Sequence, residues 1–160
     1  MSDAERFQVT RTVPVGAEAL FGVLSDPARH RELDTSGMIR DLVSGDAVTA
    51  VGDRFVLDMN NGILGDYRID NSVHRFEQGR TIGWEPSLVD PESHADKLGD
   101  VKPGGHTYTW ELTPEGTDRT AVTLTYDWST VGDPGFKKLC PIVSEQQLGE
   151  SIDKLADVAG

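Results

Sequence analysis

Two runs of alternating polarity face each other across a turn, HTYTWELT at 106–113 and TAVTLTYDWS at 120–129. The alternation predicts two β-strands, and Pro114-Glu115-Gly116 predicts a short turn between them. In an antiparallel hairpin about this turn, the inward side chains pair as Leu112 with Val122, Trp110 with Leu124, Tyr108 with Tyr126, and His106 with Trp128. The inner face of the hairpin therefore changes from aliphatic near the turn to aromatic and polar at its far end.

Five more strands are predicted upstream, at 7–13, 38–43, 54–59, 66–76 and 81–85. Turn-forming clusters separate most of them, and such short connections favour antiparallel neighbours. Phe76 is out of step with Val73, which predicts a bulge or an outward-facing ring. Residues 86–105 carry three prolines and a Gly-Gly pair and are interpreted as one long loop, a kind of segment that is usually functional or mobile.

Helices are predicted at three places. Apolar residues at 17, 20, 21 and 24 follow a helical period, and Asp26-Pro27 supplies an N-cap and a first-turn proline for a second short helix at 28–33. The last helix begins after Ser144, which forms a capping box with Gln147, and its apolar stripe starts at Leu148 and Ile152. One long helix after a one-sided antiparallel sheet should lie across the apolar face of that sheet, so the predicted class is α+β.

Composition narrows the function classes. The chain has 160 residues, the size of a single domain, and its formal net charge of -12 disfavours nucleic acid and anionic membrane surfaces as partners. No apolar run is long enough for membrane insertion, and the first residues do not resemble a signal peptide, so a cytoplasmic location is expected. The single cysteine, Cys140, excludes an internal disulfide. Neither a phosphate-binding glycine loop nor a metal-ligand spacing of histidines is present, so no cofactor and no metal are expected.

Two features suggest sites. The inward aromatic side chains of the last strands predict either a well-packed core or a cavity between the helix and the sheet. His30 and Asp34 are four residues apart, with Ser36 close by. They form either an acid/base pair or a local capping network that ties the short helices to the next strand.

Three segments carry a resemblance to a known family: LSDPARH at 24–30, GHTYTWELTP at 105–114 and TLTYDWS at 123–129. With the order of the elements, they resemble the SRPBCC (START-like) superfamily, and more narrowly its actinobacterial polyketide cyclase/dehydrase and lipid-transport-like proteins. The resemblance covers nearly the whole chain and implies one domain at 1–160. It also implies a helix-grip fold, in which a curved seven-stranded antiparallel sheet wraps around the long C-terminal helix and two short helices follow the first strand. In such a fold the short helices and sheet loops border the mouth of an enclosed cavity, and Leu33 stands where many members have an aromatic residue.

The resulting hypothesis is a carrier or sensor, a monomer or homodimer, that holds a small apolar molecule, aromatic or polyketide- or lipid-like. The residues expected to bind this ligand are Tyr67, Asn71, Trp84, His106, Tyr108, Trp110, Tyr126, Trp128, Leu148 and Ile152. The alternative is a polyketide cyclase or dehydratase that uses the same cavity, with His30 and Asp34 as its catalytic residues.

Overall fold

The computed structural model describes residues 5–34, 38–62, 64–99 and 101–160. Within them, seven strands form one antiparallel sheet in the order β1-β7-β6-β5-β4-β3-β2. The strands are β1 (Arg6–Val13), β2 (Ile39–Ser44), β3 (Arg54–Asn61), β4 (Gly65–Glu77), β5 (Thr81–Leu88), β6 (Thr107–Pro114) and β7 (Thr120–Asp127). The helices are α1 (Ala17–Leu24), η1 (Pro27–Glu32), η2 (Pro91–His94), α2 (Ala95–Leu98), α3 (Pro134–Leu139) and α4 (Glu145–Ala159), where η marks a 3-10 helix.

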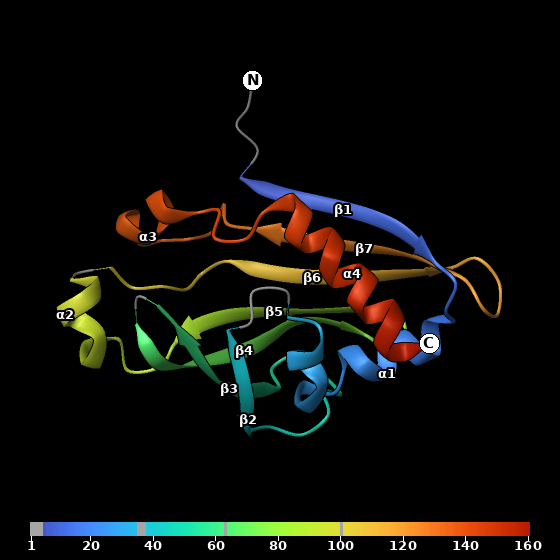
Figure 1. The fold of residues 1–160 in the computed structure, drawn as a ribbon, viewed down its shortest axis with the longest axis horizontal. Coiled ribbons are helices and arrows are strands. Elements are labelled where there is room, and N and C mark those ends of the chain that lie inside the picture. Colours follow the sequence, from blue (N-terminus) through green and yellow to red (C-terminus); the bar gives the residue numbers. More distant parts are fainter. Residues whose placement is uncertain (1–4, 35–37, 63, 100) are drawn as a thin grey trace.

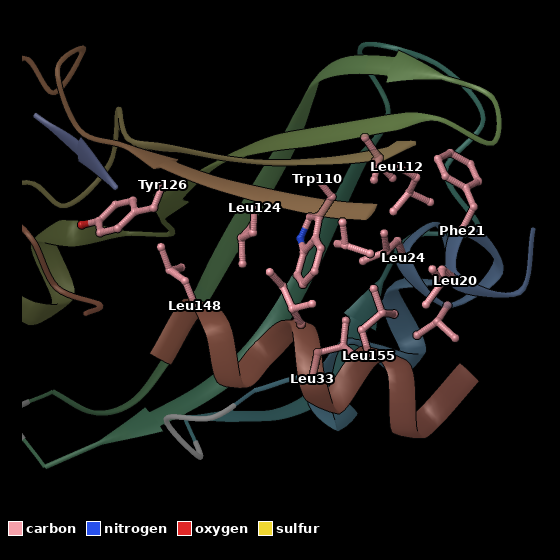
Figure 2. Packing of buried hydrophobic residues seen from close by; sticks show 14 of the residues in the cluster. Leu20, Phe21, Leu24, Leu33, Trp110, Leu112, Leu124, Tyr126, Leu148 and Leu155 are labelled. Atoms are coloured by element: carbon pink, nitrogen blue, oxygen red, sulfur yellow. The ribbon is translucent and has the colours of Figure 1, made fainter. Parts of the chain in front are cut away.

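The long helix α4 crosses one face of the sheet, and α1 lies beside its C-terminal end (Figure 1). Leu148, Ile152 and Leu155 of α4 are buried against that face, as their helical spacing predicts. They join a hydrophobic core that includes Leu20, Leu24, Trp110, Leu112 and Leu124 (Figure 2). The predicted helix-grip arrangement, with the C-terminal helix held by a curved sheet, is confirmed.

The hairpin of β6 and β7 has the predicted register in three of its four pairs: Tyr108 with Tyr126, Trp110 with Leu124, and Leu112 with Val122. The fourth predicted pair, His106 with Trp128, is not part of the ladder, which ends at Thr107 and Asp127. The Asp127 carboxylate accepts hydrogen bonds from the backbone N–H (2.8 Å) and the hydroxyl (2.6 Å) of Ser129, and this turn ends β7. His106 and Trp128 therefore lie just beyond the strands, although both are buried.

Residues 86–105 do not form one long loop, which corrects the prediction. Strand β5 continues to Leu88 through Pro86, and η2 and α2 follow it. Pro86 is tolerated there because β5 pairs with β6 only as far as Trp84, so beyond that point one side of the strand needs no N–H donor. A bridge between Ser87 and Gly104 then returns the chain to the sheet.

Three smaller details also differ from or extend the predictions. The second short helix is a 3-10 helix that begins at Pro27, and the Asp26 carboxylate caps it by accepting the Ala28 N–H. The predicted irregularity near Phe76 is a register shift between Val73 and Arg75. Helix α3 was not predicted, although Asp133-Pro134 repeats the start signal seen at Asp26-Pro27. None of the described helices combines the length and apolar character needed to cross a membrane.

The capping box of α4 supports a first prediction. The Ser144 hydroxyl accepts the Gln147 N–H at 3.1 Å, and the Gln147 side chain accepts the Ser144 N–H at 2.9 Å. Ser144→Ala removes one of these bonds and should lower the free energy of unfolding by about 1 kcal/mol. Urea denaturation measures this change, with Thr117→Ala at an exposed turn as the control. Equal stability of the two variants would contradict a role for the cap.

Candidate ligand-binding cavity

A cavity of about 440 Å³ lies between the inner face of the sheet and α4. This volume is within the range of small-molecule sites, about 300–1,000 Å³. Its wall is mostly apolar and draws on several strands, α3 and α4; the apolar members include Leu33, Ile39, Leu57, Met59, Ile69, Leu88, Trp110, Leu124, Phe136 and Leu148. The polar members are fewer, so the cavity offers an apolar molecule a large surface and a small number of hydrogen-bonding groups.

Most of the predicted site residues border this cavity, and three do not. The lining includes His30, Asp34, Tyr67, Asn71, Trp84, His106, Tyr108, Trp110 and Leu148. Three predicted residues are also buried but lie outside the lining: Tyr126, Trp128 and Ile152.

Tyr126 lies outside the lining because the Tyr108 ring stacks on it, with centroids 4.9 Å apart. The Tyr126 hydroxyl accepts the Ile142 N–H at 3.0 Å. Trp128 packs in turn on Phe7 and Tyr126. These two rings support the wall without facing the cavity.

His30 is a buried structural histidine. Its Nε2 donates a hydrogen bond to the Leu24 carbonyl at 2.8 Å, which ties η1 to the end of α1. Its ring stacks on Trp84, with centroids 4.8 Å apart, and meets the edge of Phe55. Burial lowers the pKa of His30 below its ordinary value, so the ring is neutral at pH 7.

Asp34 lies beyond the end of η1, so the expected helical pairing with His30 does not arise from a shared helix. The carboxylate of Asp34 accepts the backbone N–H of Ile39 at 2.7 Å, and its carbonyl accepts a hydrogen bond from Lys154 at 3.3 Å. His30 and Asp34 thus anchor η1 to α1, β2 and α4, as the capping hypothesis predicts. Ser36, the third member of that cluster, lies outside the described residues.

His106 is the most unusual polar group of the wall. Its side chain is 5% exposed, and its Nδ1 atom is buried without a hydrogen-bond partner. Three aromatic rings surround it, those of Tyr108, Phe136 and Tyr126, at centroid distances of 5.5, 5.4 and 5.9 Å. Burial lowers the pKa of His106 to about 4, so the imidazole is uncharged at pH 7.

Two further polar groups lie on β4. Asn71 is buried, and its side-chain N–H donates to the Phe55 carbonyl at 3.4 Å. The Tyr67 hydroxyl lies 3.5 Å from the Met38 sulfur, and burial raises the pKa of this phenol. Both residues line the cavity. Tyr67 therefore adds a neutral hydroxyl to the part of the wall formed by β4.

The comparisons with known proteins agree on architecture. No family model matches the chain. Over 132 residues it is 34% identical to the uncharacterized protein Rv0088 of Mycobacterium tuberculosis, a match that covers 81% of this chain and 51% of that protein. The chain therefore spans about half the length of this relative.

Several solved structures align over almost the entire chain. A protein from Arthrobacter aurescens has a TM-score of 0.70 at 15% identity and covers 99% of this chain and 89% of its own. The AHSA1 protein from Silicibacter pomeroyi has a TM-score of 0.62 at 18% identity, with 96% of both chains covered. Norcoclaurine synthase from Thalictrum flavum, in complex with dopamine and hydroxybenzaldehyde, has a TM-score of 0.59 at 17% identity, covering 96% of this chain and 84% of its own.

The chain has the helix-grip fold that its resemblance to the SRPBCC (START-like) superfamily implies. The expectation from the sequence segments is confirmed at this level. One fold hosts many chemistries, so the function of this chain has to be argued from the site.

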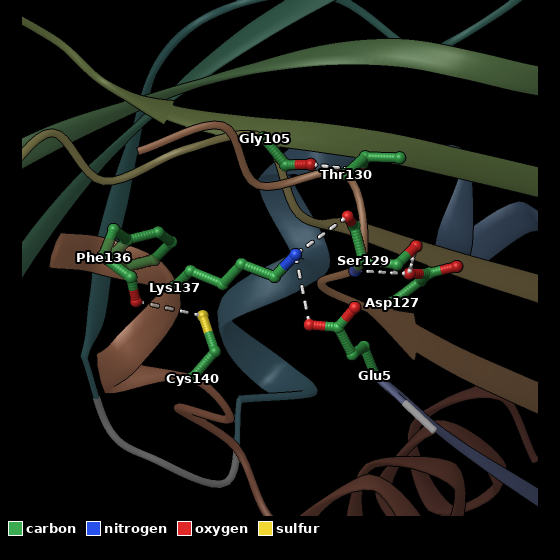
Figure 3. A network of polar contacts seen from close by, with 8 residues as sticks. All are labelled: Glu5, Gly105, Asp127, Ser129, Thr130, Phe136, Lys137 and Cys140. Carbon is green, nitrogen blue, oxygen red and sulfur yellow. Dashed lines mark hydrogen bonds and ion pairs between the residues drawn. The ribbon is translucent and has the colours of Figure 1, made fainter. Parts of the chain in front are cut away.

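The structure adds wall residues that the sequence did not predict, mainly in the chain segment that connects β7 to α4. Phe136 of α3 packs on His106, and Ile142 and Val143 complete that part of the lining. Helix α3 is held in place by Lys137, whose ammonium donates to the Ser129 carbonyl at 3.4 Å and pairs with Glu5 at 3.1 Å (Figure 3). These contacts are distant in sequence, so only the start signal at Asp133-Pro134 pointed to the helix.

Proposed function

We propose that the protein binds a small, largely apolar molecule in the cavity between the sheet and α4, as a carrier or sensor. The observation that carries this proposal is the cavity itself, about 440 Å³ with a mostly apolar wall. A START-like neighbour, norcoclaurine synthase, has been solved with dopamine and hydroxybenzaldehyde. Small ring compounds of similar size are therefore the first class of ligand to consider for this chain.

The expected affinity follows from the buried surface. A ligand that buries about 300 Å² of apolar surface gains about 7 kcal/mol from the hydrophobic effect. The loss of translational and rotational freedom opposes this gain, so binding in the micromolar range is expected. Such an affinity suits reversible loading and release.

Binding is favoured over the polyketide cyclase or dehydratase alternative. That alternative uses His30 and Asp34 as an acid/base pair, and each of these side chains holds a backbone group. His30 donates to the Leu24 carbonyl, and Asp34 accepts the Ile39 N–H. A general acid or base must instead be within reach of the substrate proton that it transfers. These contacts support a structural role for the pair.

The proposal is tested by a substitution on β4 that places a larger side chain in the cavity. Ile69 lines the cavity, whereas its neighbour Arg68 is exposed on the other face of the strand. Ile69→Trp places a bulky ring in the cavity and should weaken binding of the uncharged fluorescent probe N-phenyl-1-naphthylamine at least about tenfold. Arg68→Trp adds the same ring outside and should leave binding unchanged. Fluorescence titration measures both, with circular dichroism as the control for folding.

Equal binding by the two tryptophan variants would place the probe somewhere other than the cavity and overturn the proposal. Native mass spectrometry of the freshly purified wild-type protein gives an independent readout. A releasable excess of mass over the denatured chain would identify a bound ligand directly. The same excess should be absent from Ile69→Trp and present in Arg68→Trp.

A further inference from the structure

One tyrosine hydroxyl of the cavity wall has no hydrogen-bond partner. The Tyr67 hydroxyl lies 3.5 Å from the Met38 sulfur, and the Tyr126 hydroxyl, behind the wall, accepts the Ile142 N–H. The Tyr108 hydroxyl makes no hydrogen bond to any residue that the structure describes, although Tyr108 borders the cavity. Polar groups without a partner are rare inside folded proteins, so this hydroxyl is a candidate for contact with a ligand.

The Tyr108 oxygen is accessible. Among the described residues, the Nδ1 atom of His106 is the single side-chain nitrogen or oxygen that lacks both a partner and accessible surface. The Tyr108 oxygen also lacks a partner, so it must keep accessible surface, and the residue as a whole is only half-buried. The Tyr126 ring covers one face of the Tyr108 ring, and the His106 ring meets it edge to face. The hydroxyl end of Tyr108 is therefore the part that a ligand can reach.

The surroundings of this oxygen place it inside the protein. Burial raises the pKa of Tyr108 well above its ordinary value, and the charges of Asp34 and Tyr67 add to this shift. Asp34 precedes β2 and Tyr67 lies on β4, and both line the cavity, whereas Tyr108 lies on β6. A hydroxyl that is accessible, surrounded by protein and near groups from these other parts of the wall faces the cavity. It is also un-ionised at pH 7, so it can donate a hydrogen bond.

Strand β6 adds a second unpaired donor to the same wall. Trp110 lies two residues from Tyr108, so the two side chains are on the same face of the strand. The indole N–H of Trp110 has no hydrogen-bond partner among the described residues and, like the Tyr108 oxygen, is not closed off. The Trp110 nitrogen lies on the edge of its ring that faces Leu124, another residue of the lining (Figure 2). Because an indole N–H can only donate, the ligand group that suits both residues is an acceptor.

The charge of the wall restricts the ligand further. The described lining contains no lysine and no arginine. Burial lowers the pKa of His30 and of His106, so both rings are uncharged at pH 7. A carboxylate or phosphate would therefore enter the cavity without a counter-ion, at a high desolvation cost.

We propose that the cavity selects uncharged apolar molecules that carry an acceptor oxygen, such as the carbonyl of a ketone or aldehyde, and that the Tyr108 hydroxyl donates a hydrogen bond to this oxygen. An apolar molecule without such an oxygen leaves the hydroxyl unpaired when it fills the cavity, which weakens its binding. The proposal rests on the proposed function and names the ligand class of the same cavity.

Two naphthalenes of nearly the same shape test the selection. 2-Acetonaphthone carries a carbonyl, and 2-isopropenylnaphthalene has a methylene group in place of the oxygen. Their affinities are measured by displacement of N-phenyl-1-naphthylamine, whose own affinity is determined for each variant. Tyr108→Phe keeps the ring that stacks on Tyr126 but removes the hydroxyl. It should weaken binding of the ketone about fivefold and change that of the hydrocarbon by less than about twofold.

Tyr126→Phe is the matched control, because it removes a hydroxyl from the ring that stacks on Tyr108 but lies outside the lining. It should leave the ratio of the two affinities unchanged. 2-Naphthoate provides the test of charge and should bind the wild type at least about tenfold more weakly than the ketone. Circular dichroism checks that both variants are folded.

The outcomes separate this proposal from the proposed function. Equal losses of the ketone and the hydrocarbon in Tyr108→Phe would mean that the ring only shapes the wall, and the proposal would be wrong while cavity binding stands. Binding of 2-naphthoate as tight as that of the ketone would overturn the selection for uncharged molecules. If neither neutral compound nor N-phenyl-1-naphthylamine binds the wild type, the proposed function itself fails.

A second measurement uses the wild-type protein and needs no substitution. Infrared spectra of 2-acetonaphthone labelled with ¹³C at its carbonyl report hydrogen bonding to that oxygen. The carbonyl stretch of the bound ketone should lie at a lower wavenumber than that of the same compound in hexane, because a donated hydrogen bond weakens the C=O bond. In Tyr108→Phe the stretch should move back toward the hexane value. A hexane-like stretch in the wild type would overturn the proposal even if the ketone binds.

Discussion

Leu155→Ala is expected to lower the free energy of unfolding by about 2–5 kcal/mol, because the side chain is fully buried where α4 packs on the core. Leu155 belongs to the same cluster as Leu20 and Leu24 of α1 (Figure 2). Removing it leaves a void with no route for the surrounding side chains to fill it completely. Urea denaturation followed by circular dichroism measures the change.

Leu148→Ala is the matched control on the same helix. Leu148 is as well buried as Leu155 but borders the cavity, so its outer atoms already lack part of their packing partners. Its loss should cost at least about 1 kcal/mol less than that of Leu155, because less packing is removed. The opposite order would mean that the cavity end of α4 is the better packed end, which contradicts the position of the cavity.

The second large effect is the pH dependence of stability caused by His106. Its pKa is about 4 in the folded protein, lowered by burial from the ordinary value of 6.5. The unfolded chain therefore binds this proton first, so the stabilisation is fully present above pH 6.5 and is lost as the pH falls toward 4. Between pH 7 and pH 5, the loss from this residue should be about 2 kcal/mol. Denaturant titrations at the two pH values measure it.

His106→Phe removes this contribution, and the difference between the variant and the wild type isolates it. The variant should retain some destabilisation at pH 5, because burial also lowers the pKa of His30 and of His74. An identical pH dependence in both proteins would show that His106 is accessible to protons from solvent. That result would also remove the basis for a neutral imidazole in the cavity wall.

Elements with local signals were the ones that sequence predicted well. The start of α4 was predictable because Ser144 and Gln147 form their capping box within one helical turn. The register of the hairpin was predictable because alternation fixes the phase of each strand, as the pairing of Trp110 with Leu124 shows.

The predictions failed where contacts between residues distant in sequence decide the structure. The continuation of β5 through Pro86 depends on where its pairing with β6 ends, and α3 is held by Glu5 and Ser129 through Lys137.

The candidate site was predictable only in part, for the same reason. Sequence by itself determined which side chains point inward, because the two-residue period of a strand and the spacing of apolar residues on α4 are local properties. Tertiary structure alone decided which inward residues border empty space. Tyr108 borders the cavity, whereas Tyr126 lies behind the Tyr108 ring that stacks on it. The Nδ1 atom of His106 is buried without a hydrogen-bond partner. These outcomes depend on the separation between a curved sheet and the helix across it, a distance that no local pattern encodes.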